Sequence, residues 1–243
     1  MRRTGIALTV IITSALQANA RTKDDDHVKE ALVGISQTLL NSISTGDSSV
    51  WNTYLLENCT FVTEEGKSNT KSEMVSSIVP LPRGFSGNIK VTGPTISTYS
   101  NTAVLNYIAK EYEKVFDQEV NTEYCIAETY VKTLEGWRIL SGQVFEIPQH
   151  PKPVDVDLSI LQHYTGTYLL GDDITYEVSL EHGKLFGQRK GRPREELFAE
   201  NDTMFFTLQD ARGVKVFETR GAGGASRMIA RRNGNDIVWK KVK

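Results

Sequence analysis

Apolar and polar residues in the N-terminal part of the chain first alternate with the period of an α-helix. From residue 28 onward, apolar side chains recur at spacings of three and four, which predicts an amphipathic helix. Its predicted apolar stripe consists of Ala31, Leu32, Ile35, Leu39 and Ile43. The polar segment 22–27 is expected to fray before this helix, and Gly46 followed by Asp47 is a stop signal after it.

Two short helices are predicted before the period changes. Trp51 and Tyr54 have the spacing of neighbours on a helix face, and Asp47 or Ser48 can cap that helix. The segment "CTFVTEEG" at 59–66 predicts a strand that runs into a turn. Thr70 and Glu73 match the capping box that begins a helix, and two prolines at 80 and 82 end it.

After residue 86 the period becomes two, which is the period of a strand. Four long alternating segments, separated by short turns, occupy residues 87–99, 102–116, 120–132 and 137–147. Such strands pair as an antiparallel meander, which curls and needs helices against one face. Residues 27–148 therefore predict an α+β fold, a curved antiparallel sheet with three helices against one face.

A second domain is predicted after a proline-rich segment. The prolines at 148, 151 and 153 favour a stiff extended linker, which we assign to residues 149–154. Short alternating segments follow at 174–181, 184–189, 204–208, 214–218, 226–231 and 236–240. Such spacing predicts a small all-β barrel or sandwich domain over residues 155–243.

The first twenty residues have the composition of a secretory signal peptide. Arg2 and Arg3 supply a basic start, residues 5–16 are mostly apolar, and Ala18-Asn19-Ala20 matches the A-x-A cleavage pattern. The apolar run is shorter than the about 20 residues that a membrane-spanning helix needs. We therefore expect cleavage after Ala20, a secreted or periplasmic location and no membrane anchor.

Charge and cysteine content narrow the function. A formal net charge of −2 over 243 residues argues against a nucleic-acid partner, because such partners require a basic surface. Cys59 and Cys125 are too few for a disulfide scaffold, and they leave two alternatives, two buried thiols or one disulfide. The sequence has no His or Cys spacing typical of a metal site, so no metal or cofactor is expected.

Several quoted segments carry a family resemblance. "STGD" at 44–47, "CTFVTEEGK" at 59–67, "NTAVLNYIAKEYE" at 101–113 and "AETYVKTLEGWRIL" at 127–140 resemble the nuclear-transport-factor-2-like family, in its SnoaL-like branch of domains of unknown function. The resemblance implies a cone with a hydrophobic pocket at its wide end. Some members of that family are polyketide cyclases, dehydratases or steroid isomerases, and others bind ligands or dimerise. "YTGTY" at 164–168, "GKLFGQRKGRPREELF" at 183–198 and "DTMFF" at 202–206 resemble a small β-domain found C-terminal to secreted serine β-lactamase-like modules.

Strand alternation assigns side chains to the predicted pocket. In "EGWRILSGQVF" at 135–145, one face carries Trp137, Ile139, Ser141, Gln143 and Phe145. We expect this face to point inward, together with the odd-numbered positions of 103–111 and 125–131. Glu128 and Arg138 fall on the opposite, outward face. The predicted ligand-binding residues are Trp51, Tyr54, Phe61, Tyr107, Thr129 and Gln143.

A catalytic role needs a titratable side chain near the substrate. Glu111 is the carboxylate on the predicted inward face, so it is the candidate catalytic residue; the alternative is a rim carboxylate paired with Lys or Arg. Tyr107 lies on the same face at a strand distance of about 13 Å, too far to form a dyad with it.

Three functional hypotheses remain open from sequence. The first is an exported, non-catalytic or weakly catalytic protein that binds a small hydrophobic or aromatic molecule and pairs as a homodimer through the outer sheet face. The second is a cyclase, dehydratase or isomerase in which Glu111 is the base and Tyr107 or Gln143 polarises a carbonyl. The third is a structural interaction module of the cell envelope.

Overall fold

The computed structural model describes residues 7–219 and 224–243, with side chains from residue 25 onward except at 211 and 212. The chain divides into two compact units, Met1–Ile147 and Pro148–Lys243. Each has its own hydrophobic core, so each is described by itself.

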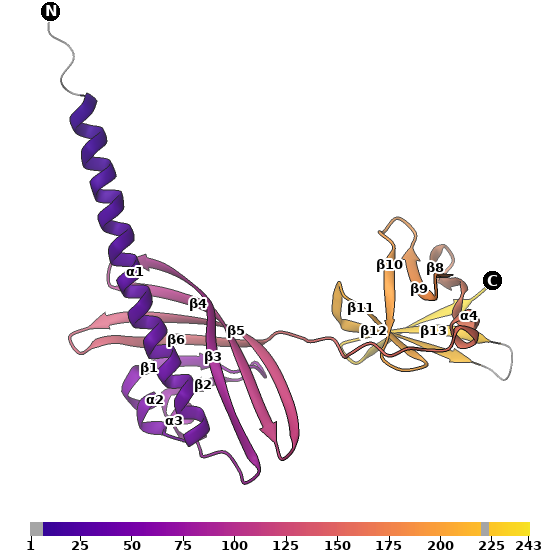
Figure 1. Ribbon diagram of the computed structural model, residues 1–243, viewed down its shortest axis with the longest axis horizontal. Helices are drawn as coiled ribbons and strands as arrows, with labels where there is room; N and C mark the ends of the chain where they lie inside the picture. Colours follow the sequence, from indigo (N-terminus) through magenta and orange to yellow (C-terminus); the bar gives the residue numbers. More distant parts are fainter. Residues whose placement is uncertain (1–6, 220–223) are drawn as a thin grey trace, which may run out of the picture. The chain divides into compact units, whose positions relative to one another are not determined.

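The first unit is an α+β domain in which three helices cover one face of a curved sheet (Figure 1). The helices are α1 (Ala7–Thr45), α2 (Ser48–Tyr54) and α3 (Lys71–Ser77). The strands are β1 (Leu55–Val62), β2 (Ser68–Thr70), β3 (Phe85–Tyr99), β4 (Thr102–Val115), β5 (Gln118–Thr133) and β6 (Gly136–Glu146). They follow the order β2-β1-β6-β5-β4-β3. β3 to β6 form the predicted antiparallel meander, but β1 pairs parallel to β6, so the sheet is mixed.

Helix α1 begins earlier than its hydrophobic pattern predicts. The segment 22–27, expected to fray, lies inside α1, because it contains no glycine or proline that would interrupt the helix. Of the predicted signal peptide, residues 1–6 lie outside the described residues and 7–20 belong to this helix. Among the described residues, no helix is both long and apolar enough to cross a bilayer.

The predicted helix boundaries 45–48 and 70–71 are confirmed by the local hydrogen bonds. Gly46 has a φ of 69°, and the N–H groups of Gly46 and Asp47 bond back to Ile43 and Ser42 at the end of α1. Asp47 then caps α2 by accepting from the backbone N–H of Ser49. The capping box of Thr70 and Glu73 at the start of α3 is complete in both directions.

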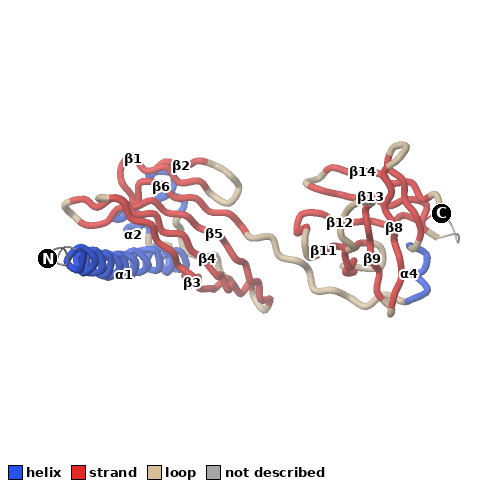
Figure 2. Tube along the Cα trace, turned by 90° about the horizontal axis from the view of Figure 1, so that it is seen from above, coloured by secondary structure: helices blue, strands red, loops and turns tan. Residues whose placement is uncertain are grey.

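The second unit is a closed eight-stranded antiparallel barrel with one short helix, α4 (Leu158–Tyr164). Its strands are β7 (Gly166–Leu170), β8 (Ile174–Glu181), β9 (Lys184–Arg189), β10 (Glu195–Ala199), β11 (Met204–Thr207), β12 (Asp210–Thr219), β13 (Ala225–Arg232) and β14 (Asn235–Lys241). The order around the barrel is β10-β11-β12-β13-β14-β7-β8-β9, and Figure 2 shows these strands around a common interior.

Helix α4 corrects the prediction of an all-β second domain. The described residues contain four helices rather than three, because the spacing of Leu158, Leu161 and Tyr164 forms a seven-residue helix after Asp157. Leu161 and Tyr164 of α4 are buried in the barrel core, where the Tyr164 ring stacks on Phe217 at 4.5 Å between centroids. The predicted linker is partly bound to this unit, since His150 stacks on Phe206 and Val154 donates a backbone hydrogen bond to Ala199.

Candidate functional site

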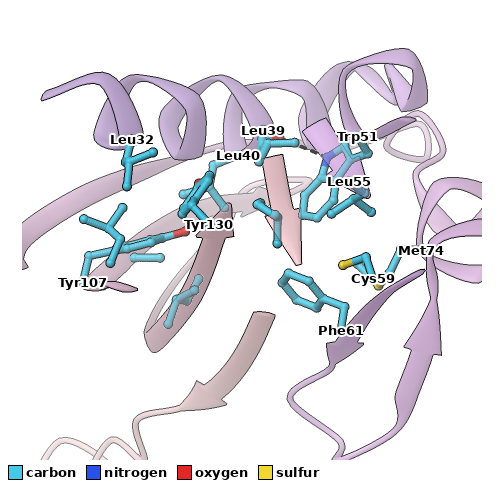
Figure 3. Packing of buried hydrophobic residues seen from close by; sticks show 14 of the residues in the cluster. Leu32, Leu39, Leu40, Trp51, Leu55, Cys59, Phe61, Met74, Tyr107 and Tyr130 are labelled. Atoms are coloured by element: carbon cyan, nitrogen blue, oxygen red, sulfur yellow. Dashed lines mark hydrogen bonds between the residues drawn. The ribbon is translucent and has the colours of Figure 1, made fainter. Parts of the chain in front are cut away.

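A pocket of about 460 Å³ lies between the helices and the inner face of the sheet in the first unit. Helices α1, α2 and α3 and all six strands of this unit contribute to its wall. The apolar part of the lining consists of Leu39, Leu40, Ile43, Trp51, Phe61, Met74, Ile78, Ile89, Ala109, Ile126 and Val144. In Figure 3, Leu39 and Leu40 reach from α1 toward the sheet and Trp51 lies beside Leu39, while Phe61 and Met74 lie farther from α1. Such a wall suits a largely apolar molecule of small size.

The deepest polar group of the pocket is the carboxyl of Glu128, whose residue is only 2% exposed. Tyr107 donates its hydroxyl to Oε1 of Glu128 at 3.0 Å, and Tyr130 donates to Oε2 at 2.9 Å. The hydroxyl of Ser36 lies 2.6 Å from the same Oε2. Three hydroxyl groups from α1, β4 and β5 therefore surround one carboxyl, which removes part of the cost of burying it.

Burial sets the protonation of this network. The pKa of Glu128 is raised because burial disfavours the carboxylate, and the hydrogen bonds from Ser36, Tyr130 and Tyr107 oppose that rise. Burial, followed by the neighbouring charge of Glu128, also raises the pKa of Tyr107 and of Tyr130 far above the usual range. The tyrosines therefore stay protonated and act as donors to the glutamate.

A second tyrosine–glutamate pair lies nearer the edge of the pocket. Tyr124 donates its hydroxyl to Oε2 of Glu111 at 2.9 Å, and both residues line the pocket and are half-buried. Burial raises the pKa of Glu111, and the hydrogen bond from Tyr124 partly offsets the rise. The pKa of Glu64 is raised by burial and then by the nearby Glu65 and Glu146. The lining contains Lys67 as its cation and more than one glutamate, so it has more acidic than basic side chains.

Asn69 supplies a polar atom without a partner. The residue is 7% exposed and lines the pocket from β2, and its side-chain oxygen has no hydrogen-bond partner among the described residues. The amide nitrogen contacts the Met74 sulfur at 3.6 Å. A buried acceptor left unpaired is costly, so this oxygen marks a place where a ligand donor would bind favourably.

The structure brings four of the predicted site residues to the pocket. Trp51, Phe61, Tyr107 and Glu111 line it. The indole N–H of Trp51 is bonded to Leu39 O and Ser42 Oγ, at 3.2 and 3.0 Å, so only the ring of Trp51 is offered to a ligand. Glu111 is paired with a tyrosine, Tyr124, rather than with the Lys or Arg considered from sequence.

Three predicted ligand-binding residues lie elsewhere. Tyr54 is outside the pocket lining and packs near Arg138, whose guanidinium carbon is 5.7 Å from the ring centroid. Gln143 is exposed. Thr129 pairs with Ser141, and this pairing places Thr129 on the outer face. The assignment of Thr129 and Gln143 to the inner face was therefore wrong.

A bulge explains the error on β6. Thr129 pairs with Ser141 but Tyr130 pairs with Ile139, so Leu140 is an extra residue on β6. Before the bulge Ile139 is fully buried, as predicted. After it the alternation is inverted: Gly142 and Val144 point inward, and Phe145 is 56% exposed.

On β5 the wrong face was chosen altogether. Tyr124, Ile126, Glu128 and Tyr130 face the pocket and core, and Cys125 is exposed. The prediction followed the rule that a charged position faces solvent, and Glu128 breaks that rule. The signal that could have revealed it is the larger apolar surface of the two tyrosines and Ile126.

The described residues contain no group of three or more His, Cys, Asp or Glu side chains that could hold a metal ion. Both cysteines are free thiols; Cys59 is buried and Cys125 is exposed. Burial raises the pKa of Cys59 to about 11, so its thiol is a poor nucleophile.

No protein-family model matches the chain. A search of curated proteins finds 30% identity over 148 residues with penicillin-binding protein 4* of Bacillus subtilis, covering 59% of this chain and 32% of that protein. The chain thus spans about a third of the length of this relative. Because Pro148–Lys243 is about two-fifths of the chain, the matched part includes residues of the first unit.

Solved structures similar to the chain include NTF2-like proteins. One is an NTF2-like protein from Cytophaga hutchinsonii, with 14% identity, a TM-score of 0.40, and coverage of 49% of this chain and 97% of that one. A superfamily protein from Salmonella enterica has 18% identity, a TM-score of 0.44 and coverage of 51% and 94%. The CamKII hub homology domain of Chlamydamonas reinhardtii has 15% identity, a TM-score of 0.45 and coverage of 49% and 98%. These likenesses concern the fold alone.

Proposed function

We propose that the first unit binds a small, largely apolar molecule that is neutral or cationic, in the pocket lined by Trp51, Phe61 and Tyr107. The observation that carries this proposal is the unpartnered side-chain oxygen of Asn69 in a mostly apolar wall. A ligand that donates one hydrogen bond to Asn69 and fills the apolar volume would satisfy both features.

The charge preference follows from the acidic lining. The pocket lining contains the carboxyl groups of Glu64, Glu65 and Glu111, and its cation is Lys67. A carboxylate or phosphate ligand would meet like charges there, whereas a neutral or amine-bearing ligand would not.

A thermal-shift and calorimetry series with one aromatic skeleton tests both statements. 2-Naphthol, 2-naphthylmethylamine and 2-naphthoate share a ring system and differ in charge. We expect the neutral and cationic compounds to raise the melting temperature, and 2-naphthoate to have no effect. If 2-naphthoate binds as well as the other two, the charge assignment is wrong.

A pair of amide variants locates the binding. Asn69→Leu should weaken binding of 2-naphthol on the order of tenfold or more while the fold is kept, because the buried acceptor is lost. Gln143→Leu changes an amide of the outer face and should leave binding unchanged. Equal binding by the wild type and Asn69→Leu would show that Asn69 does not contact the ligand, and absence of binding by all three compounds would favour the structural-module hypothesis.

Acid–base catalysis is the second candidate, favoured by the half-buried Glu111–Tyr124 pair. A carboxyl with a raised pKa, held by a tyrosine at a pocket wall, is suited to accept a proton at neutral pH. The carbonyl-polarising role predicted for Tyr107 or Gln143 has no support, since Tyr107 donates to Glu128 and Gln143 is exposed. If a substrate is found, Glu111→Gln should cut turnover on the order of 100-fold or more with binding nearly intact. Unchanged turnover would exclude Glu111 as the catalytic base and would leave binding as the proposed function.

We also propose export of the protein to a secreted or periplasmic location. The basic start, the apolar run and Ala18-Asn19-Ala20 support this. N-terminal sequencing of the mature protein should begin at Arg21. A product that retains Met1 in the cytoplasm would contradict the proposal.

Homodimerisation through the outer sheet face is a further proposal. The exposed side chains of Phe145 and Tyr112, which are 56% and 37% exposed, support it. In analytical ultracentrifugation we expect a dimer for the wild type and a monomer for Phe145→Lys. A monomeric wild type would exclude the dimer.

A further inference from the structure

The barrel interior contains polar groups that its own residues do not satisfy. The hydroxyl of Tyr176 and the indole nitrogen of Trp239 are buried, in residues that are 5% and 6% exposed, and neither has a hydrogen-bond partner among the described residues. Native proteins rarely leave such groups unpaired, so each group is expected to have a bound molecule as its hydrogen-bond partner.

The rings that carry the two groups lie close together. The rings of Tyr176 on β8 and Trp239 on β14 are 5.8 Å apart between centroids. A Cβ added at Gly187 on β9 would lie 1.9 Å from the Tyr176 hydroxyl, so that hydroxyl occupies the inward space which a side chain at 187 would need. Both polar atoms therefore belong to the barrel interior rather than to its outer surface.

A cation reaches the same place from the opposite wall. The ammonium of Lys215 on β12 lies 5.6 Å from the centroid of the Tyr176 ring. It has no ion pair within 4.0 Å among the described residues. Its pKa is lowered by burial, and the acidic groups that oppose this are Glu195, which also acts on Tyr176, and Asp210. Lysine and tryptophan can only donate hydrogen bonds, so the Tyr176 hydroxyl is the one acceptor among these three side chains.

Lys215, Tyr176 and Trp239 lie toward one end of the barrel, and α4 lies at the other end. The Tyr164 ring of α4 packs on the rings of Phe205 and Phe217, and these two rings also contact each other. Lys215 precedes Phe217 on β12, and Glu195 begins β10 just after the basic turn 189–194. The exposed Arg189, Lys190 and Arg192 of this turn add positive charge beside the same end of the strands.

From this arrangement we propose that the barrel binds a small carboxylate between Lys215, Tyr176 and Trp239. The ammonium supplies the opposing charge, and the hydroxyl and the indole N–H supply hydrogen bonds to the carboxylate oxygens. Glu195 lies near the same groups and limits the affinity by repulsion. This site is separate from the apolar pocket of the first unit and does not depend on its proposed function.

The experiment follows the indole N–H signals of the full chain by NMR during titration with sodium acetate and sodium benzoate. The chain has three tryptophans, and the Trp239 signal is assigned by its loss in Trp239→Phe. At constant ionic strength we expect a saturable downfield shift of the Trp239 signal. The Trp51 signal should stay fixed, since that N–H is already bonded to Leu39 and Ser42. Acetamide and benzamide are the neutral controls and should not bind.

Four variants make the proposal specific. Lys215→Met should weaken carboxylate binding at least about tenfold, whereas Lys184→Met, which removes a cation paired with Glu196, should leave it unchanged. Glu195→Gln should strengthen it several-fold, because a like charge is removed. Tyr176→Phe should weaken binding and, without ligand, keep or raise the melting temperature, because an unpaired buried hydroxyl is removed.

Two results would overturn the inference. One is a Trp239 signal that does not move up to high millimolar carboxylate, with Tyr176→Phe lowering the melting temperature of the free chain; the polar atoms would then be satisfied by ordered water only. The other is a shift of the same size with the neutral amides or in Lys215→Met, which would show that the site does not recognise the carboxylate charge.

Discussion

The Tyr107 hydroxyl on β4 donates a 3.0 Å hydrogen bond to Oε1 of Glu128 on the neighbouring strand β5. A second tyrosine–glutamate hydrogen bond joins the same two strands, but here the donor, Tyr124, is on β5 and the acceptor, Glu111, is on β4. The inner pair is buried and shares its glutamate with Ser36 and Tyr130, whereas the second pair is half-buried at the pocket wall. The same tyrosine–glutamate contact therefore occurs in two environments, which makes each pair a control for the other.

Removing the Tyr107 hydroxyl should cost more stability than removing that of Tyr124. Tyr107→Phe leaves a fully buried carboxyl with one donor fewer, so we expect a loss of about 1–3 kcal/mol in the free energy of unfolding. Tyr124→Phe affects a carboxyl that water can partly reach, and we expect a loss of at most about 1 kcal/mol. Urea unfolding at neutral pH measures both. Equal losses would show that Glu128 is not the more dependent carboxyl.

Stability should fall as the pH rises above the usual carboxyl range, and Glu128→Gln should reduce that fall. The folded-state pKa of Glu128 is raised by burial, so the folded chain binds this proton more tightly than the unfolded chain. The contribution is therefore full below the unfolded pKa of about 4.3 and is lost as the pH rises toward the raised folded value.

The test is the free energy of unfolding of the wild type and Glu128→Gln from pH 4 to 8. Glu111 and Glu64 also have raised pKa values, so part of the slope should remain in the variant and should shrink further in Glu111→Gln. An identical slope in the wild type and Glu128→Gln would mean that Glu128 titrates alike in both states.

Two glycine-to-alanine changes should have opposite effects. A Cβ at Gly142 would lie 2.1 Å from the Phe61 ring, so Gly142→Ala must displace a buried side chain and should destabilise by about 1–3 kcal/mol. Gly34 is exposed on α1 with nothing within 4 Å of the added atom, and Gly34→Ala should stabilise by about 0.5–1 kcal/mol. Thermal unfolding measures both; a harmless Gly142→Ala would place Gly142 away from Phe61.

One thiol should react in the native chain and two after unfolding. Cys125 is exposed, whereas Cys59 is buried with a pKa of about 11. Titration with a thiol-reactive disulfide reagent should label one cysteine, and Cys125→Ser should abolish the native reaction. A native chain without reactive thiols that gains two only after reduction would instead indicate a disulfide.

Much of the element order follows from local signals that the sequence carries by itself. The four meander strands lie within two residues of their predicted bounds, because period-two alternation and short turns are local properties. The caps at Asp47 and Thr70 are equally local, since each needs only a side chain and the N–H groups two or three residues later. Strands β2, β7 and β10 and helix α4 were not among the predicted elements, as short segments carry too few periods.

The candidate site was decided by tertiary structure. An extra residue at Leu140 inverts the facing of Gln143, and the register shift appears only when β6 pairs with β5. Glu128 points inward because Ser36 on α1 and Tyr107 on β4 come from distant parts of the chain to bond it. Taken alone, a glutamate in an alternating strand is expected in water, since burying it without partners would be too costly. The sequence therefore determined which residues form strands and helices, whereas the long-range hydrogen bonds decided which strand face could be buried.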